Sequence, residues 1–217
     1  MEIKVIFENK DIAVIEKPNG MPSQPDRTGD MDAKTALEKI VGNECFIINR
    51  LDRPVGGAVL FAKNPKAAAE LTKILNEGKI EKTYTAVVCG KAKESGTMED
   101  YLLKNSRTNM SVVSDKSNKN AKKAILEYEK TGEAVSDEYR ILSLVKIHLL
   151  TGRHHQIRVQ FASRGLPLWG DTKYNAEFAK KRGYFATALW SSRISFRYKN
   201  QDISVESKPQ GNIFEIF

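Results

Sequence analysis

Residues 49–64 read NRLDRPVGGAVLFAKN, and they place a carboxylate directly before an apolar run. The run AVLFA at 58–62 predicts a buried strand, and Gly56 and Gly57 allow another backbone or a ligand to approach closely. Asp52 lies between Arg50 and Arg53. An oriented carboxylate at such a place can attack a sugar carbon or an electron-poor ring. The local sequence alone favours a simpler hypothesis, an ion-paired residue in a surface turn.

A second stretch, GRHHQIR at 152–158, gathers two arginines, two histidines and a glutamine at the start of a predicted helix. Such a helix end offers free backbone N–H groups and a partial positive charge, which suits a phosphate. The alternative is a solvated basic helix end. Adjacent histidines on a helix point apart, and no acidic or cysteine ligand is suitably spaced. We therefore predict no metal site.

Tyr84 lies in a third stretch, EKTYTA at 81–86, which is typical of a strand. A strand tyrosine usually packs in the core. In an enzyme that acts on RNA the same ring could stack on a base.

The composition is that of one globular chain with a basic excess. The 217 residues include 35 Lys plus Arg against 27 Asp plus Glu, a net charge of +8 that favours a polyanionic partner. Cys45 and Cys89 show no metal-ligand spacing, so we expect buried free thiols in a reducing compartment. No apolar stretch is long enough to span a bilayer. We therefore expect a cytoplasmic protein with no membrane partner, and a monomer.

Periodicity and turn residues predict the elements. Strands are expected on both sides of a turn at 9–11, in 57–63, 82–90, 124–133 and 139–149, and near 194–198 and 203–205. Helices are expected at 32–41, from Pro65 to Gly78, and around 157–162. Residues 91–123 are polar and basic, and we expect an exposed loop there. The pattern predicts an α/β protein of the α+β type, with a mixed, mostly antiparallel sheet and few flanking helices, as one domain over 1–217.

These stretches, taken in order, resemble the RluA family of RNA pseudouridine synthases. The resemblance rests on VIEKPNGMP at 14–22, NRLDRPVGGAVLFAKN at 49–64, KTYTAVV at 82–88 and GRHHQIRVQFASRGLPLWGDTKY at 152–174. It spans roughly residues 10 to 196. A single motif would be weak, but four in the right order are a strong signal.

The resemblance implies the family's catalytic fold, with a central cleft, and a role for individual residues. Asp52 corresponds to the catalytic aspartate, and Arg158 corresponds to the basic residue that pairs with it. Tyr84 corresponds to the tyrosine that stacks on the target base. Whether this tyrosine also assists proton removal is left open. From position and charge, we expect contacts to RNA from a further set of residues: Arg50, Lys82, Arg153, His154, His155 and Gln156.

Four positions depart from the family pattern, and one of them is Val55, which stands where the family usually has threonine. Asn49 stands where the family usually has histidine, and Gly56 takes the place of a usual serine and so lacks a hydroxyl. Trp190 replaces a family histidine in ALWSS at 188–192. None of these changes removes a proposed catalytic group.

The implied reaction converts a uridine of a ribosomal or transfer RNA stem-loop to pseudouridine. It involves no net redox change or hydrolysis, so no cofactor is expected. One alternative is a non-catalytic RNA-binding module on the same scaffold. Another is a nucleoside or glycoside hydrolase, which usually needs two carboxylates. Asp171 could be the second, although its place in WGDTKY favours a turn.

Overall fold

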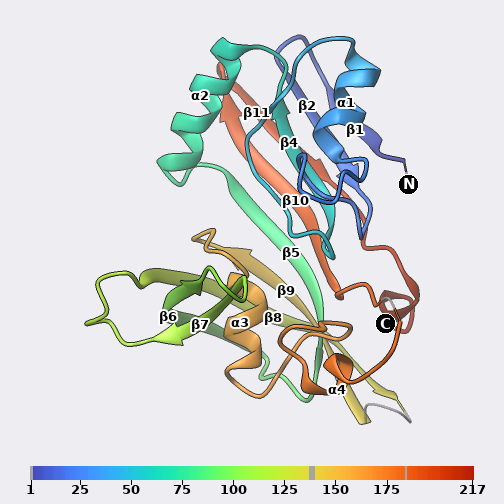
Figure 1. The fold of residues 1–217 in the computed structure, drawn as a ribbon, viewed down its shortest axis with the longest axis vertical. Coiled ribbons are helices and arrows are strands. Elements are labelled where there is room, and N and C mark those ends of the chain that lie inside the picture. Colours follow the sequence, from blue (N-terminus) through green and yellow to red (C-terminus); the bar gives the residue numbers. More distant parts are fainter. Residues whose placement is uncertain (1, 137–139, 184) are drawn as a thin grey trace. The chain divides into compact units, whose positions relative to one another are not determined.

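The computed structural model describes residues 2–136, 140–183 and 185–217. The chain divides into two compact units: unit 1 comprises Met1–Thr83 and Trp190–Gln210, and unit 2 comprises Tyr84–Leu189 and Gly211–Phe217. Both are built mainly from strands with few helices, which confirms the predicted α+β class (Figure 1). The central cleft stays a prediction.

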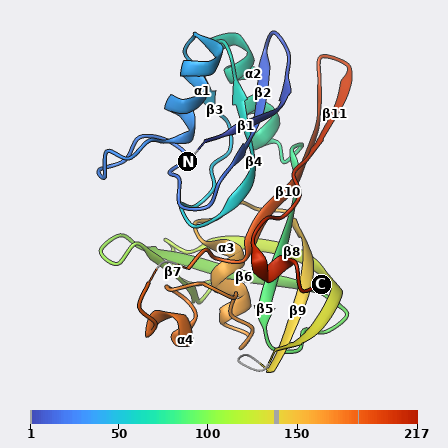
Figure 2. The same ribbon diagram turned by 90° about the vertical axis from the view of Figure 1, so that its right-hand side faces the viewer.

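Unit 1 contains an antiparallel sheet with one parallel pair. Its strands are β1 (Lys4–Glu8), β2 (Ile12–Lys17), β4 (Gly56–Ala62), β10 (Leu189–Tyr198), β11 (Gln201–Glu206) and the short β3 (Phe46–Ile47). The order is β1-β2-β4-β10, with β11 beside β10 and β3 beside β4; β4 and β10 are the parallel neighbours. Strands β10 and β11 form a long hairpin (Figure 2). These strands confirm the predictions for this part of the chain.

The helices of unit 1 begin where their capping residues predict. Helix α1 (Ala33–Val41) follows Asp32, whose side chain accepts from the Thr35 N–H. Helix α2 (Pro65–Asn76) follows Asn64, whose side chain accepts from the Ala67 N–H. Such caps satisfy backbone donors that lack an intrahelical partner. The apolar face of α2 packs into a core cluster that also contains residues of β2, β4, β10 and β11.

Unit 2 contains a second set of strands. Its strands are β5 (Glu81–Cys89, which begins in unit 1), β6 (Ser95–Asn105), β7 (Met110–Ser114), β8 (Lys122–Ser136) and β9 (Arg140–Leu149), in the order β5-β9-β8-β6-β7. Of these, β9, β8, β6 and β7 pair antiparallel in that order. Helix α3 (Gln156–Ala162) packs Val159 against Leu102 and Ala124 of this sheet. A short helix α4 (Ala176–Ala179) and a 3-10 turn (Asn212–Phe214) complete the unit.

The prediction of an exposed loop over residues 91–123 was wrong. Strands β6 and β7 occupy about half of it, and β8 begins at Lys122. In β6, Met98 and Leu102 are buried while Thr97 and Glu99 are exposed. One face of the strand is therefore covered and the other solvated, so half of its residues are polar and the segment resembles a loop in composition.

The two cysteines are free thiols, as predicted. Cys45 is buried and Cys89 is half-buried; burial raises the pKa of both thiols, that of Cys89 to about 11. Such thiols are poor nucleophiles at neutral pH. Within the described ranges, no helix is long and apolar enough to cross a membrane.

Candidate active site

Asp52 is half-buried and lies in the loop that leads into β4. The Val55 N–H closes this loop by donating to the carbonyl oxygen of Asp52 at 3.0 Å. All seven residues of β4 are buried. The carboxylate is therefore carried at the start of a fixed strand, the position that the sequence predicted.

The turn at residues 17–23 holds the Asp52 loop from both sides. Ser23 Oγ donates to the carbonyl of Leu51 at 2.8 Å and accepts from the Leu51 N–H at 3.0 Å. The Gly20 N–H donates to the carbonyl of Arg53 at 2.8 Å. Because the carbonyls before and after Asp52 both have donors, the loop has little freedom to rearrange.

Lys17 is a residue of this site that the sequence reasoning missed. Its side chain is fully buried, and Nζ donates to the carbonyls of Met21 at 2.8 Å, Pro18 at 3.0 Å and Arg53 at 3.4 Å. Burial lowers the pKa of Lys17 to about 7, although the nearby Asp52 carboxylate acts to raise it. Lys17 lies within VIEKPNGMP, a stretch used above only for the family resemblance.

Asn49 contributes to the backbone of β4. Its Oδ1 accepts from the Leu60 N–H at 2.8 Å. Its Nδ2 is buried and has no partner among the described residues. Asn49 therefore stabilises the strand behind Asp52.

Gly56 and Trp190 face each other across the parallel pair β4–β10. A Cβ atom at position 56 would overlap the indole ring of Trp190 and lie 2.5 Å from Oδ1 of Asn19. The same asparagine donates through Nδ2 to the carbonyl of Pro54 at 3.0 Å. Trp190 is buried, and its Nε1 donates to Ser207 Oγ at 2.9 Å. The missing side chain at Gly56 thus makes room for the indole.

The arginines beside Asp52 have different surroundings. Arg50 is exposed. The guanidinium group of Arg53 forms an ion pair with Asp30, lies 3.7 Å from Asp26 and donates to Thr28 Oγ1 at 3.1 Å. Arg53 therefore fastens residues 26–30 to the Asp52 loop.

Lys82 and Tyr84 lie on one face of β5, since residues two apart in a strand share a face. Tyr84 is buried, and burial lowers the pKa of the half-buried Lys82. Strand β5 thus presents an aromatic ring and an ammonium group on the same side.

Arg158 forms a buried, bidentate ion pair with Asp171 inside unit 2. Nε lies 2.8 Å from Oδ2 and Nη2 lies 2.7 Å from Oδ1. Asp171 Oδ1 also accepts from the backbone N–H groups of Lys173 and Tyr174, at 2.9 and 3.2 Å. The prediction that Asp171 holds a turn is therefore confirmed, whereas its ion pair with Arg158 was missed. Two parallel hydrogen bonds fix the plane of the guanidinium group.

His154 and His155 stack on each other with ring centroids 3.8 Å apart. Ser111 Oγ donates to the carbonyl of His154 at 2.9 Å and lies 2.9 Å from Nδ1 of the same residue. The Tyr174 hydroxyl accepts from the Ser111 N–H at 2.7 Å and lies 2.9 Å from Nδ1 of His155. The Tyr174 hydroxyl therefore joins β7 to the histidine pair.

Gln156 supports the turn before α3. Its Oε1 accepts from Thr151 Oγ1 at 2.8 Å and from the Arg153 N–H at 3.0 Å, and its Nε2 donates to the carbonyl of Ile125 at 3.0 Å. Arg153 is exposed and donates through Nε to the carbonyl of Lys123 at 2.8 Å. This geometry favours a positioning role for the buried Gln156 and leaves Arg153 on the surface.

Unit 2 thus brings Arg153, His154, His155 and Arg158 together at the start of α3, while unit 1 carries Asp52 and Arg50. The expected pair between Asp52 and Arg158 joins residues of different units and stays a prediction. Asp171 is fully buried and bound to Arg158, an arrangement unlike that of the exposed second carboxylate that a glycosidase needs. Within the described residues, no group of three or more His, Cys, Asp or Glu side chains could hold a metal ion.

Comparison with known proteins places the chain in a family. The model of the RNA pseudouridylate synthase family matches residues 11–163. The tRNA pseudouridine synthase C of Haemophilus ducreyi is 32% identical, with 91% of this chain and 86% of that protein covered. The ribosomal large subunit pseudouridine synthase C of Rickettsia bellii is 31% identical, with 94% and 67% covered.

The fold is also found in a solved structure. That of human RNA pseudouridylate synthase domain containing 1 has a TM-score of 0.82 at 20% identity, and it covers 95% of this chain and 83% of the human chain. With the family model and the relatives above, this likeness confirms the predicted fold. The chain belongs to the RluA family of RNA pseudouridine synthases.

Proposed function

We propose that Asp52 is the catalytic carboxylate of this RNA pseudouridine synthase and that residues 1–217 act as one catalytic domain. The observation that carries the proposal is the way the Asp52 loop is held: the turn at 17–23 donates to the carbonyls of Leu51 and Arg53, while the carboxylate leads a buried strand. A catalytic group needs such fixed support from its surroundings.

The reaction breaks the bond between uracil N1 and ribose C1′, turns the uracil and joins its C5 to C1′. Asp52 would act either by covalent attack or by removing a ribose proton, and both routes start from an ionised carboxylate. We propose that Arg158 pairs with that carboxylate, with its plane set by Asp171. Tyr84 would stack on the target base.

The substrate in this proposal is a stem-loop of transfer or ribosomal RNA, since relatives named for each are similar to this chain. A uridine in a loop is unstacked at low cost and can be flipped into the site. Arg50, Lys82, Arg153 and the two histidines would contact the RNA, and Gln156 would hold the turn that carries Arg153. We further propose a cytoplasmic monomer.

The test is Asp52→Asn, which keeps the size of the side chain and removes its charge. Pseudouridine formation on unmodified transfer and ribosomal RNA, measured by chemical labelling, should fall by roughly 10³-fold or more, while RNA affinity and folding change little. Asp202→Asn, at an exposed position of β11 in the same unit, is the matched control and should keep full activity. Retained activity in Asp52→Asn would contradict the proposal. Release of free uracil by the wild-type protein would indicate a hydrolase.

A further inference from the structure

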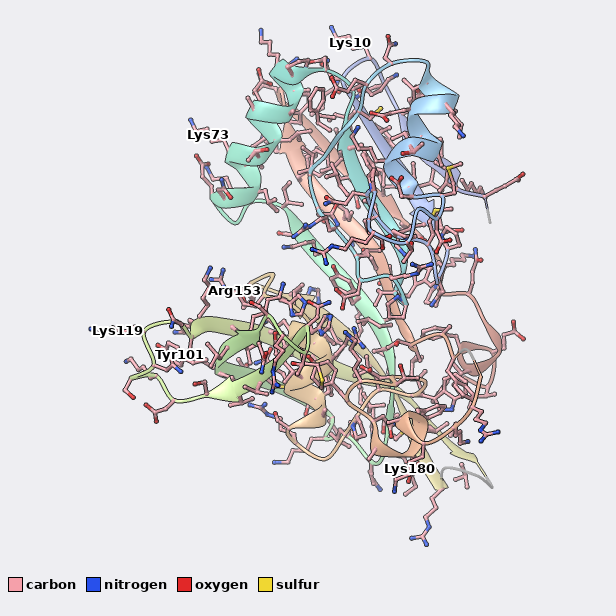
Figure 3. The ribbon with its side chains drawn as sticks, in the orientation of Figure 1. Lys10, Lys73, Tyr101, Lys119, Arg153 and Lys180 are labelled. Atoms are coloured by element: carbon pink, nitrogen blue, oxygen red, sulfur yellow. The ribbon has the colours of Figure 1, made fainter. Side chains whose placement is uncertain are left out.

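A second basic surface lies outside the residues assigned above. Residues 104–123 contain six basic residues and one acidic residue, Asp115. All six basic residues are exposed, on strands β6 and β8 and on the turns at both ends of β7: Lys104, Arg107, Lys116, Lys119, Lys122 and Lys123. We call these six the hairpin basic surface. Figure 3 labels Lys119 on this part of unit 2, with Tyr101 and Arg153 on the same side in that view.

Both turns that carry these charges are held by their own hydrogen bonds. Asn105 Oδ1 accepts from the N–H groups of Arg107 and Thr108, at 3.0 and 3.2 Å. Asp115 Oδ1 accepts from the Ser117 N–H at 2.7 Å. The five residues of β7 separate the two turns by about 17 Å. The charges are therefore presented from two defined places rather than from a flexible tail.

The hairpin basic surface is bonded to the turn that carries the histidine pair. Ser111 of β7 donates through Oγ to the carbonyl of His154 at 2.9 Å. The Arg153 guanidinium donates to the carbonyl of Lys123 at 2.8 Å, and Lys173 Nζ donates to the carbonyl of Asn109 at 3.0 Å. An anion bound to the hairpin would thus lie on the same rigid part of unit 2 as the start of α3.

We propose that the hairpin basic surface is a second RNA-docking site, which binds the sugar-phosphate backbone of the double-stranded stem next to the target loop. The inference rests on the proposed function, because that function requires a structured RNA. It assigns the two parts of the RNA to different residues. The residues at the start of α3 bind the loop, and the hairpin basic surface binds the stem.

A stem fits this surface better than a single strand does. Proteins that bind single strands offer aromatic side chains on which successive bases stack. Here the exposed residues are mostly polar or basic, on the turns and on the flanking strands, together with Val112 and Val113 of β7. Tyr101 is half-buried on β6. Lysines bind phosphates as point charges without reading sequence, which suits recognition of a duplex by shape and backbone.

The test uses the full chain with Lys116, Lys119 and Lys122 all changed to Gln. The control changes Lys10, Lys66 and Lys73 to Gln, three exposed lysines of unit 1 that match the loss of charge. Affinity is measured against salt concentration with two probes, an RNA stem-loop and an oligouridylate that has the same number of phosphates. For the stem-loop, the hairpin variant should bind about tenfold more weakly, and its salt dependence should be shallower by about 1 per lysine, so about 3 in total.

The outcomes separate clearly. A loss on the stem-loop alone, with the control unchanged, supports the docking site. An equal loss in the control would show a general effect of net charge, and an equal loss on the oligouridylate would show a site for single strands; either would overturn the inference, as would an unchanged salt dependence. Binding is measured without turnover, so a failure of Asp52 as the catalyst would leave this result readable.

Discussion

Gly56 and Trp190 are two positions at which we expect a departure from the family pattern, and their places in the structure explain each other. They are neighbours across β4 and β10, and a Cβ atom at 56 would overlap the indole. The sequence alone suggested that Gly56 merely lacks a hydroxyl. The parallel pairing of residues 134 positions apart is not encoded locally, so their interdependence could not be predicted.

We predict that Gly56→Ser is destabilising by about 1–3 kcal/mol, because extra atoms enter a filled space. Trp190→His should also be destabilising, since it leaves a cavity and removes the bond to Ser207. Together the two changes should cost less than the sum of the single changes, by about 0.5–3 kcal/mol. Urea unfolding of the two single variants and the double variant measures this coupling. Strictly additive free energies of unfolding would contradict the packing argument.

At the scale of elements, the predictions that held depend on local signals. The first residues of α1 and α2 follow from Asp32, Asn64 and Pro65, which act on backbone groups a few residues away. Strand β6 was missed because its polar face concealed the alternation. Strand β7 was missed because it shows no alternation: Ser111 is buried, while Val112 and Val113 are exposed. The support of the Asp52 loop by residues 17–23 was also missed, since the partners lie about 30 residues apart and Ser23 carries no signal of its own.

Because Lys17 is buried beside the Asp52 loop, its titration should make the free energy of unfolding depend on pH. Its pKa of about 7 in the folded protein lies below the ordinary value of 10.5, so between these limits the unfolded chain binds more protons. The free energy of unfolding must then rise with pH from about 7 to about 10.5, and below 7 the full cost of burying the charge applies. We predict that Lys17→Met flattens this rise, as measured by urea unfolding at pH 6, 8 and 10.

The matched control is Lys4→Met, which removes an exposed lysine of β1 in the same unit. It should keep the wild-type pH dependence, because its ammonium group is in water in both states. Lys17→Met should also lower pseudouridine formation, since the carbonyls of Met21 and Pro18 lose a donor beside the Asp52 loop. An unchanged slope in Lys17→Met would show that the buried amine does not titrate in this range.

At the scale of the whole molecule, we expect one domain over residues 1–217, whereas the structure divides into two compact units. The chain passes between them at 83/84, 189/190 and 210/211, and strands β5 and β10 each contain residues of both units. Unit 1 is therefore assembled from two separate segments, 1–83 and 190–210. If either strand unravels, both units lose backbone hydrogen bonds. This connectivity favours cooperative unfolding, in line with the proposal of a single catalytic domain.

The two tryptophans test that cooperativity directly, because Trp190 belongs to unit 1 and Trp169 to unit 2. Trp169→Phe leaves a fluorescent probe in unit 1, and Trp190→Phe leaves one in unit 2. Within each variant, we predict that fluorescence and far-ultraviolet circular dichroism give the same urea midpoint and the same slope, as a two-state transition requires. Each variant is compared with itself, so the loss of the Trp190 bond to Ser207 shifts the midpoint without affecting the comparison. A fluorescence transition that precedes the loss of secondary structure in either variant would show that the units unfold separately, and residues 1–217 would then be two domains.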